Sequence, residues 1–110
     1  MLRTRLSIAP ASAAVGGLVL AELTVENASS TPVTLAFPTA QRLELEVGSY
    51  RWGRGRLFAA VLGELVLAPG ERWSTTVEAA LDLEPGSYTA RARLTAAGPP
   101  VTAEAPLTIA

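Results

Sequence analysis

The chain has 110 residues, a formal net charge of −1 and nine basic residues that are all arginine, and it contains neither cysteine nor histidine. This balance gives no electrostatic reason to expect binding to nucleic acid or to an acidic membrane surface. The missing residue types exclude disulfides, Ser-His-Asp and Cys-His catalytic groups, and an ordinary zinc site. The length predicts one domain covering residues 1–110.

The N-terminal segment allows two interpretations. Arg3 and Arg5 precede an apolar stretch that runs to about Ala21, which is typical of a signal peptide. However, Pro10 and Gly16 interrupt that stretch. Residues 2–8 also alternate apolar and polar side chains, as a strand does. We therefore interpret residues 2–8 as a first strand and expect a cytoplasmic protein, with the signal peptide as the lesser alternative. No run is long and apolar enough to span a membrane.

Most of the remaining chain also alternates with period two, which predicts short strands with one buried face. The predicted strands cover residues 18–27, 33–37, 43–47, 65–67, 72–78, 88–95 and 101–109. Glycine, proline and small polar residues mark turns between them, including a loop at residues 10–17. The spacing of Phe58, Val61 and Leu62 predicts one helical turn.

About eight short strands with turn signals between them predict an all-β fold, an immunoglobulin-like antiparallel β-sandwich. Tyr88 opens a predicted strand directly after the Pro85-Gly86 turn. This placement is similar to the tyrosine corner of such sandwiches, in which the tyrosine hydroxyl bonds back to upstream backbone.

One stretch, residues 48–58 (GSYRWGRGRLF), breaks the alternation. It combines three aromatic residues, three arginines and three glycines. We interpret it as an irregular loop on a regular scaffold, which is where binding residues are commonly carried.

Residues suited to catalysis or metal binding are scarce. Glu44 and Glu46 share a strand face, but a solvated face balanced by nearby arginines explains them better than a carboxylate pair. Asp82 is the only aspartate, and calcium sites need clustered acidic or amide side chains. We therefore expect no enzyme activity, no metal and no cofactor.

An ordered set of short motifs resembles the BsuPI family, bacterial intracellular proteinase inhibitors with an immunoglobulin-like β-sandwich. The motifs are Leu23-Thr-Val-Glu-Asn27, Pro32-Val-Thr-Leu-Ala-Phe-Pro38, Gln41-Arg-Leu-Glu-Leu45, Trp52, Phe58, Leu65-Val-Leu-Ala-Pro-Gly-Glu71 and Gly86-Ser-Tyr88. The resemblance covers roughly residues 18–96. The family often has serine directly after its tryptophan, where this chain has Gly53.

The resemblance implies an inhibitor or regulator of an intracellular serine protease of the subtilisin-like class, but it supplies no reactive site. We expect the chain to act by protein–protein binding through the loop 48–58, because this stretch breaks the regular pattern. The candidate partner-binding residues are Tyr50, Trp52, Arg54, Arg56 and Leu57. A subtilisin-like partner favours an aromatic or leucine anchor, and a trypsin-like partner favours arginine.

A structural role competes with this one at the aromatic positions. Trp52 and Phe58 could cap an open end of the sandwich, and we expect Phe58 in the core and Arg54 and Arg56 exposed. The alternative function is a non-catalytic interaction or accessory domain that binds through an edge strand and has no protease target. Under either function we expect a monomer or a weak dimer.

Overall fold

The computed structural model describes residues 1–53, 58 and 62–110. Ten strands cover most of these residues: β1 (Leu2–Ala9), β2 (Ser12–Ala13), β3 (Leu18–Asn27), β4 (Val33–Phe37), β5 (Leu43–Val47), β6 (Tyr50–Trp52), β7 (Gly63–Leu67), β8 (Arg72–Ala80), β9 (Gly86–Leu94) and β10 (Thr102–Ile109). No helix occurs among the described residues. The helical turn predicted from Phe58 to Leu62 rests on residues 59–61, which lie outside the described residues.

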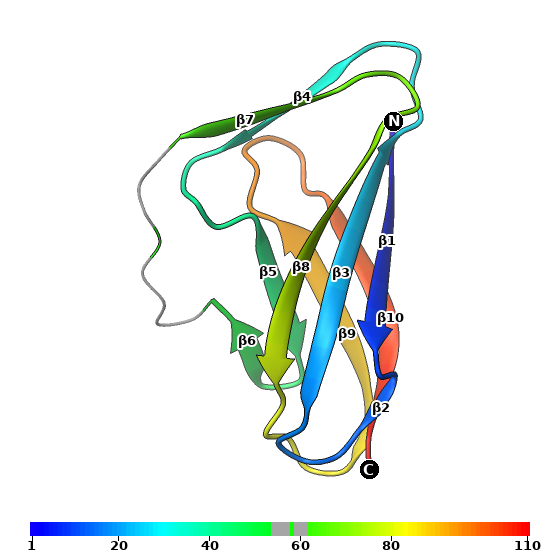
Figure 1. Ribbon diagram of the computed structural model, residues 1–110, viewed down its shortest axis with the longest axis vertical. Helices are drawn as coiled ribbons and strands as arrows, with labels where there is room; N and C mark the ends of the chain where they lie inside the picture. The colour runs from blue at the N-terminus through cyan, green and yellow to red at the C-terminus, as the bar shows by residue number, and fades with distance from the viewer. Residues whose placement is uncertain (54–57, 59–61) are drawn as a thin grey trace.

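The strands form two packed layers (Figure 1). A three-stranded sheet of order β1-β3-β8 faces a five-stranded sheet of order β2-β10-β9-β5-β6. A separate ladder of β4 and β7 extends from one end of the sandwich. The predicted all-β sandwich is confirmed.

The alternating pattern explains which face of each strand is buried. On β3, Val19, Ala21, Leu23 and Val25 are buried, and the residues between them are exposed or half-buried. All eight residues of β1 pair in continuous register with β3. A one-residue slip would turn the charged face of β3 into the core, so the burial pattern fixes this register.

Two short strands lie where the sequence predicted loops. β2 pairs in parallel with the end of β10, joining Ser12 to Thr108 and Ala13 to Ile109. Two residues are too few to show a period, so no pattern could reveal β2. The other addition is β6, which forms the start of the segment 48–58 and is described with the site below.

The two sides of the sandwich differ. On one side β1 lies beside β10, and the Thr4 hydroxyl donates a hydrogen bond of 2.7 Å to the carbonyl oxygen of Thr102. On the other side the two sheets end at β8 and β6 (Figure 1). The candidate site lies on this second side.

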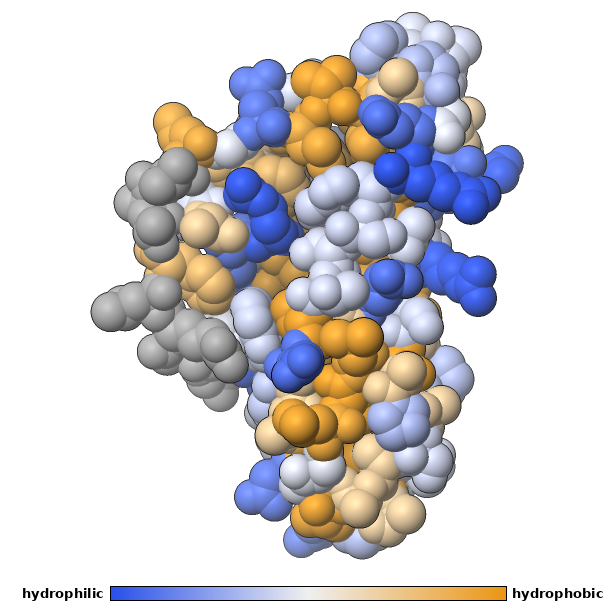
Figure 2. All heavy atoms as spheres, in the orientation of Figure 1, coloured by the Kyte–Doolittle hydropathy of each residue, from blue (hydrophilic) through white to orange (hydrophobic). Residues whose placement is uncertain are grey.

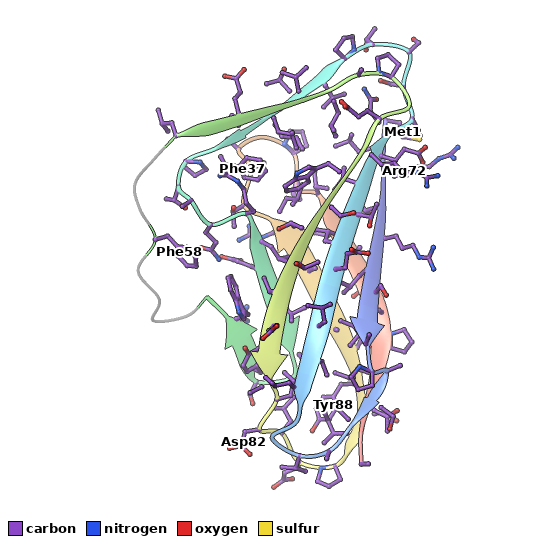
Figure 3. All side chains as sticks on the ribbon, in the orientation of Figure 1. Met1, Phe37, Phe58, Arg72, Asp82 and Tyr88 are labelled. Atoms are coloured by element: carbon purple, nitrogen blue, oxygen red, sulfur yellow. The ribbon has the colours of Figure 1, made fainter. Side chains whose placement is uncertain are left out.

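Two polar residues tie strands to turns. The Tyr88 hydroxyl donates a 2.6 Å hydrogen bond to the carbonyl oxygen of Glu84, so the predicted tyrosine corner is present (Figure 3). Asn27 is fully buried, and its amide nitrogen donates to the carbonyl oxygens of Thr31 and Leu67. Its side-chain oxygen accepts from the backbone and hydroxyl of Ser29. These bonds hold the end of β3, the following turn and β7 together.

Candidate functional site

The segment predicted as an irregular loop begins as a β-hairpin. β6 pairs antiparallel with β5, which places Tyr50 opposite Val47 and Trp52 opposite Leu45. Gly48 in the connecting turn has φ of +56°. Every residue with positive φ in the described part of the chain is a glycine. Glycine with positive φ at the first of two turn residues is the pattern of a type II′ hairpin, which matches the twist of the flanking strands. The loop prediction is therefore wrong for residues 50–52.

The hairpin turn rests on the tyrosine corner. A Cβ atom on Gly48 would lie 3.0 Å from Cε1 and 3.2 Å from Cδ1 of the Tyr88 ring. Glycine is thus required there by its backbone angle and by the close approach of Tyr88. The ring of the tyrosine corner thus supports the turn that leads into β6.

Trp52 and Phe58 pack against each other at the open side of the sandwich. Their ring centroids are 5.9 Å apart and their planes are inclined by 50°, a tilted geometry that aromatic pairs favour. Both side chains are half-buried. The prediction that Phe58 lies in the core is therefore wrong, because its half-buried ring packs on Trp52 instead.

Trp52 also stands between two surface depressions. One, of about 250 Å³, is lined with Gln41, Glu44, Leu45, Arg51 and Gly53. The other, of about 510 Å³, is lined with Leu18 of β3 and with Thr76, Val77, Glu78 and Ala80 of β8. Trp52 thus lies beside residues of both sheets, and its side chain is half-buried rather than fully exposed or buried in the core.

Gln41 supports the point at which the chain leaves β6. Gly53 has φ of +96°, and a Cβ atom there would lie 2.7 Å from Nε2 of Gln41. That amide nitrogen donates a 3.0 Å hydrogen bond to the carbonyl oxygen of Leu43. A serine at position 53 would need a strained backbone and a displaced Gln41, which explains the glycine at this position.

Arg42 supports the point at which the chain enters β7. A Cβ atom on Gly63 would lie 2.6 Å from Nη2 of Arg42. The guanidinium lies 4.5 Å from the centroid of the Phe37 ring and donates a 2.8 Å hydrogen bond to the carbonyl oxygen of Thr39. Two consecutive residues therefore hold the two ends of the segment 53–63.

The charges near the hairpin form cross-strand ion pairs. Glu46 pairs with Arg51 at 2.6 Å, and Glu44 pairs with Arg93 at 2.6 Å. Farther along the same sheet, the hydrogen bond and the charge of Glu104 raise the pKa of Arg91 above its ordinary value. Each of the two glutamates is matched by an arginine, so the interpretation as a balanced, solvated face is confirmed.

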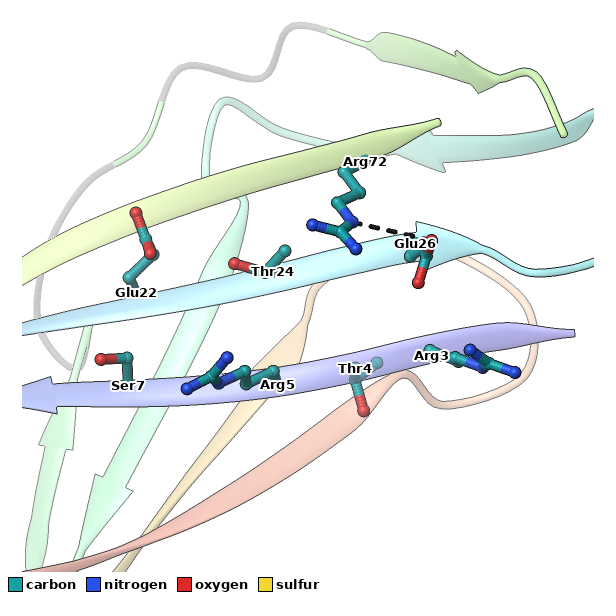
Figure 4. Close-up of a pocket in the computed structure, with 8 residues that line it drawn as sticks. All are labelled: Arg3, Thr4, Arg5, Ser7, Glu22, Thr24, Glu26 and Arg72. Atoms are coloured by element: carbon teal, nitrogen blue, oxygen red, sulfur yellow. Dashed lines mark ion pairs between the residues drawn. The ribbon is translucent and has the colours of Figure 1, made fainter. Parts of the chain in front are cut away.

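A third depression, on the outer face of the β1-β3-β8 sheet, lies away from the hairpin (Figure 4). It has a volume of about 410 Å³, and its lining of mixed charge is partly exposed and partly half-buried. The lining residues are Arg3, Thr4, Arg5, Ser7, Glu22, Thr24, Glu26 and Arg72. Arg72 approaches Glu26 at 3.6 Å. None of the candidate residues from the sequence lies here.

A family model described as "BsuPI: Intracellular proteinase inhibitor" matches residues 6–99. The chain belongs to the BsuPI family. Three residues on which the resemblance in sequence rests lie close together, since Gln41, Trp52 and Phe58 meet at the base of one segment. Among curated proteins, none matches the chain.

Solved structures similar to this BsuPI-family chain share its fold at low sequence identity. The sporulation control protein Spo0M of Bacillus subtilis has a TM-score of 0.65 and 11% identity, over 98% of this chain and 49% of that one. The CARDB domain of the PF1109 protein of Pyrococcus furiosus, solved with di-metal ions, has a TM-score of 0.63 and 14% identity, over 100% and 88%. A β-glucosidase of Erythrobacter marinus has a TM-score of 0.60 and 15% identity, over 100% of this chain but only 15% of the enzyme.

Metal binding and membrane insertion are two other classes of function on which the described residues bear. In residues 1–53, 58 and 62–110, no three side chains of the metal-binding types cluster together. No helix in the same part of the chain is long and apolar enough to cross a membrane.

The structure describes only part of the candidate partner-binding set. Tyr50 and Trp52 lie on β6, while Arg54, Arg56 and Leu57 lie outside the described residues. Sequence reasoning missed the supporting roles of Gln41 and Arg42. Their position directly before β5, within the Gln41–Leu45 motif, was the signal that could have pointed to them.

Proposed function

We propose that this chain inhibits an intracellular serine protease of the subtilisin-like class by protein–protein binding through residues 48–58. Membership of the BsuPI family supports the activity class. The observation that carries the proposal is the convergence of Gln41, Trp52 and Phe58 at the base of this segment. The proposal places the chain in the cytoplasm with its target, in keeping with the family's description as intracellular.

The supports at both ends suit a binding segment. An inhibitor binds more tightly when its contact segment is already held, because less conformational freedom is lost on association. Gly48 against Tyr88, Gly53 against Gln41 and Gly63 against Arg42 are three such supports. Protease–inhibitor interfaces bury about 800 Å² on each partner, centred on a few anchor side chains.

The candidate anchors fall into two chemical groups. Tyr50, Trp52 and Leu57 suit the apolar specificity pocket that a subtilisin-like protease offers. Arg54 and Arg56 suit a pocket with a buried acid, as in trypsin-like proteases. The proposal assigns the anchor to the first group.

Inhibition assays with alanine variants test this assignment. We expect W52A, Y50A or L57A to weaken inhibition of a subtilisin-like protease at least tenfold, whereas R54A and R56A have smaller effects. R5A is the matched control, since Arg5 lies on the outer face of the other sheet. Thermal unfolding of each variant separates loss of contact from loss of fold. A wild-type chain that slows no protease in a panel of subtilisin-like and trypsin-like enzymes contradicts the proposal.

Fluorescence gives a second readout. The chain has two tryptophans, so W73F leaves Trp52 as the single indole reporter. Binding of a catalytically inactive protease should shift the emission of Trp52 to shorter wavelength, because a half-exposed indole becomes buried. An inhibited protease with unchanged Trp52 emission would place the contact elsewhere on the chain.

A further inference from the structure

Strand β8 is a long sheet edge. It pairs with β3 through nine consecutive residue pairs without a bulge, from Glu26 opposite Arg72 to Leu18 opposite Ala80. The opposite edge strand of this sheet, β1, lies beside β10. The edge strands of the other sheet, β2 and β6, have only two and three residues. Within the described residues, β8 thus has a long outer edge with which no strand pairs, and Trp52 of β6 borders it near Thr76 and Glu78.

The sequence of β8 lacks the usual protection of an edge. Natural edge strands are blunted by proline, by bulges or by charges along their length. Residues 73–77 of β8 carry no charge and no proline. A depression of about 510 Å³ borders the strand at Thr76, Val77, Glu78 and Ala80, and Leu18 of β3 and Trp52 of β6 complete its lining. The backbone of β8 is therefore suited to pairing with a further strand.

The charges on β8 indicate which strand would pair with its free edge. Its two charged residues, Arg72 and Glu78, have opposite signs, are both exposed and point to the same outer face. They lie at equal distances in sequence on either side of Thr75. Residues opposite each other in an antiparallel pair point to the same face of the sheet. When two copies of one strand pair symmetrically, one residue therefore lies opposite itself, and the two-fold axis passes between its two copies.

We propose that β8 pairs antiparallel with β8 of a second copy of this chain, with Thr75 on the two-fold axis. This register places Arg72 of each copy opposite Glu78 of the other, so two ion pairs form by symmetry. It also places Trp73 opposite Val77 and Ser74 opposite Thr76. The two three-stranded sheets then join into one sheet of six strands.

Neighbouring registers lose the charge match. With Thr76 on the axis, Arg72 faces Ala80 and Glu78 faces Ser74. With Ser74 on the axis, Glu78 faces Gly70, beyond the strand. Only the register centred on Thr75 joins the opposite charges directly, and such cross-strand pairs stabilise a sheet.

Both charges are available for this contact. The Arg72 side chain is 72% exposed and its Nε atom approaches Glu26 at 3.6 Å, which leaves the rest of the guanidinium open (Figure 4). Glu78 has no ion pair with any residue that the structure describes.

The same face carries exposed apolar side chains next to β8. Leu18 and Leu20 of β3 are 64% and 44% exposed. Figure 2 shows apolar side chains gathered on the lower half of this face. A second copy paired at β8 extends the sheet beside these residues. The contact is small, since a single strand pair buries less than a standard interface, so the dimer is weak and depends on concentration.

Sedimentation velocity over a concentration series tests the charge match. We expect R72E and E78R each to weaken self-association at least fivefold, because two like-charge contacts replace two ion pairs. The double variant R72E/E78R should regain wild-type association within about twofold. An equimolar mixture of the two single variants should associate more strongly than either variant alone, because the mixed dimer restores both attractive contacts.

The control for net charge is R5E, which makes the same change of charge on β1 and should leave association unchanged. Circular dichroism and thermal unfolding confirm that each variant is folded. A wild-type chain that stays monomeric up to about 1 mM overturns the proposal. So does association that neither R72E nor E78R weakens.

Cysteine cross-linking tests the register independently, since the chain contains no natural cysteine. In the proposed register, T75C faces its own copy directly, with Cβ atoms about 5 Å apart. S74C and T76C face their own copies only diagonally, at about 7–8 Å. We expect T75C to form the disulfide dimer fastest under mild oxidation. Equal or faster cross-linking of S74C or T76C overturns the register.

This inference goes beyond protease inhibition and does not depend on it. Loss of dimerisation in R72E with unchanged inhibition would separate the two.

Discussion

The Nε2 atom of Gln41 lies 2.7 Å from the point that a Cβ atom on Gly53 would occupy. Gly53 also has φ of +96°, a backbone angle that side chains other than glycine rarely adopt. We expect G53A to lower the free energy of unfolding by about 2 kcal/mol, the sum of backbone strain and a disturbed hydrogen bond from Gln41 to Leu43. Chemical denaturation measures this loss.

Gly70 provides the control for that prediction. Its φ is +80°, but no atom lies within 4 Å of its Cβ position. G70A should therefore cost only the backbone strain, about 1 kcal/mol. If G53A and G70A cost the same, Gln41 does not support Gly53 in solution.

Arg42 should resist replacement even by lysine. Its guanidinium stacks on Phe37, donates to Thr39 and packs against Gly63, and an ammonium group cannot make all three contacts. We expect R42K to cost about 1 kcal/mol in the free energy of unfolding. G63A should be destabilising in the wild type but better tolerated in an R42A background, because the atom it would meet is gone. Strict additivity of G63A and R42A in a double-mutant cycle would argue against direct contact.

The buried Asn27 should be among the most sensitive polar residues. N27L removes both donors and leaves the carbonyl oxygens of Thr31 and Leu67 without this partner. We expect a loss of about 3 kcal/mol in thermal or chemical unfolding. S29A removes the hydroxyl bond to the Asn27 oxygen and the exposed bonds between the hydroxyl and the Thr31 backbone, and it should cost about 1 kcal/mol. If N27L lowers the free energy of unfolding less than S29A does, the buried Asn27 side chain is not the main support of this turn.

The tyrosine corner separates into a hydroxyl and a ring. Y88F removes the hydrogen bond to Glu84 but keeps the ring beside Gly48, so we expect a loss of about 1 kcal/mol. Y88A removes the ring as well and should cost about 3 kcal/mol. Equal losses in the two variants would mean that the ring contributes nothing to the hairpin turn.

Local patterning was sufficient to predict most of the strands. The alternation in Leu18–Asn27 and Gly86–Leu94 predicted both the strands and their buried faces, because one side of each sheet is solvated. β6 was missed, since its glycine-rich flanks and aromatic residues hide the period. The signal was nevertheless present, because Gly48-Ser49 between Val47 and Tyr50 is a recognised hairpin pair.

The candidate site was only partly predictable, for a different physical reason. The aromatic residues and glycines of the segment 48–58 marked it as unusual. The contacts that hold it come from Gln41, Arg42 and Tyr88, which are distant in sequence from the atoms they touch. No single-sequence pattern encodes such contacts, because they depend on which strands pair in the five-stranded sheet and on where the β4-β7 ladder meets it.

The paired supports at Gln41 and Arg42 have a consequence for how such proteins diversify. When both ends of a connection are held by the scaffold, changing its length costs little, about 0.6 kcal/mol for each doubling. The chain between Gly53 and Gly63 can then be replaced or lengthened without disturbing the strands on either side. A sandwich of this kind could evolve to bind new targets by changes in the segment between Gly53 and Gly63 alone, while the sequences of its strands stay the same.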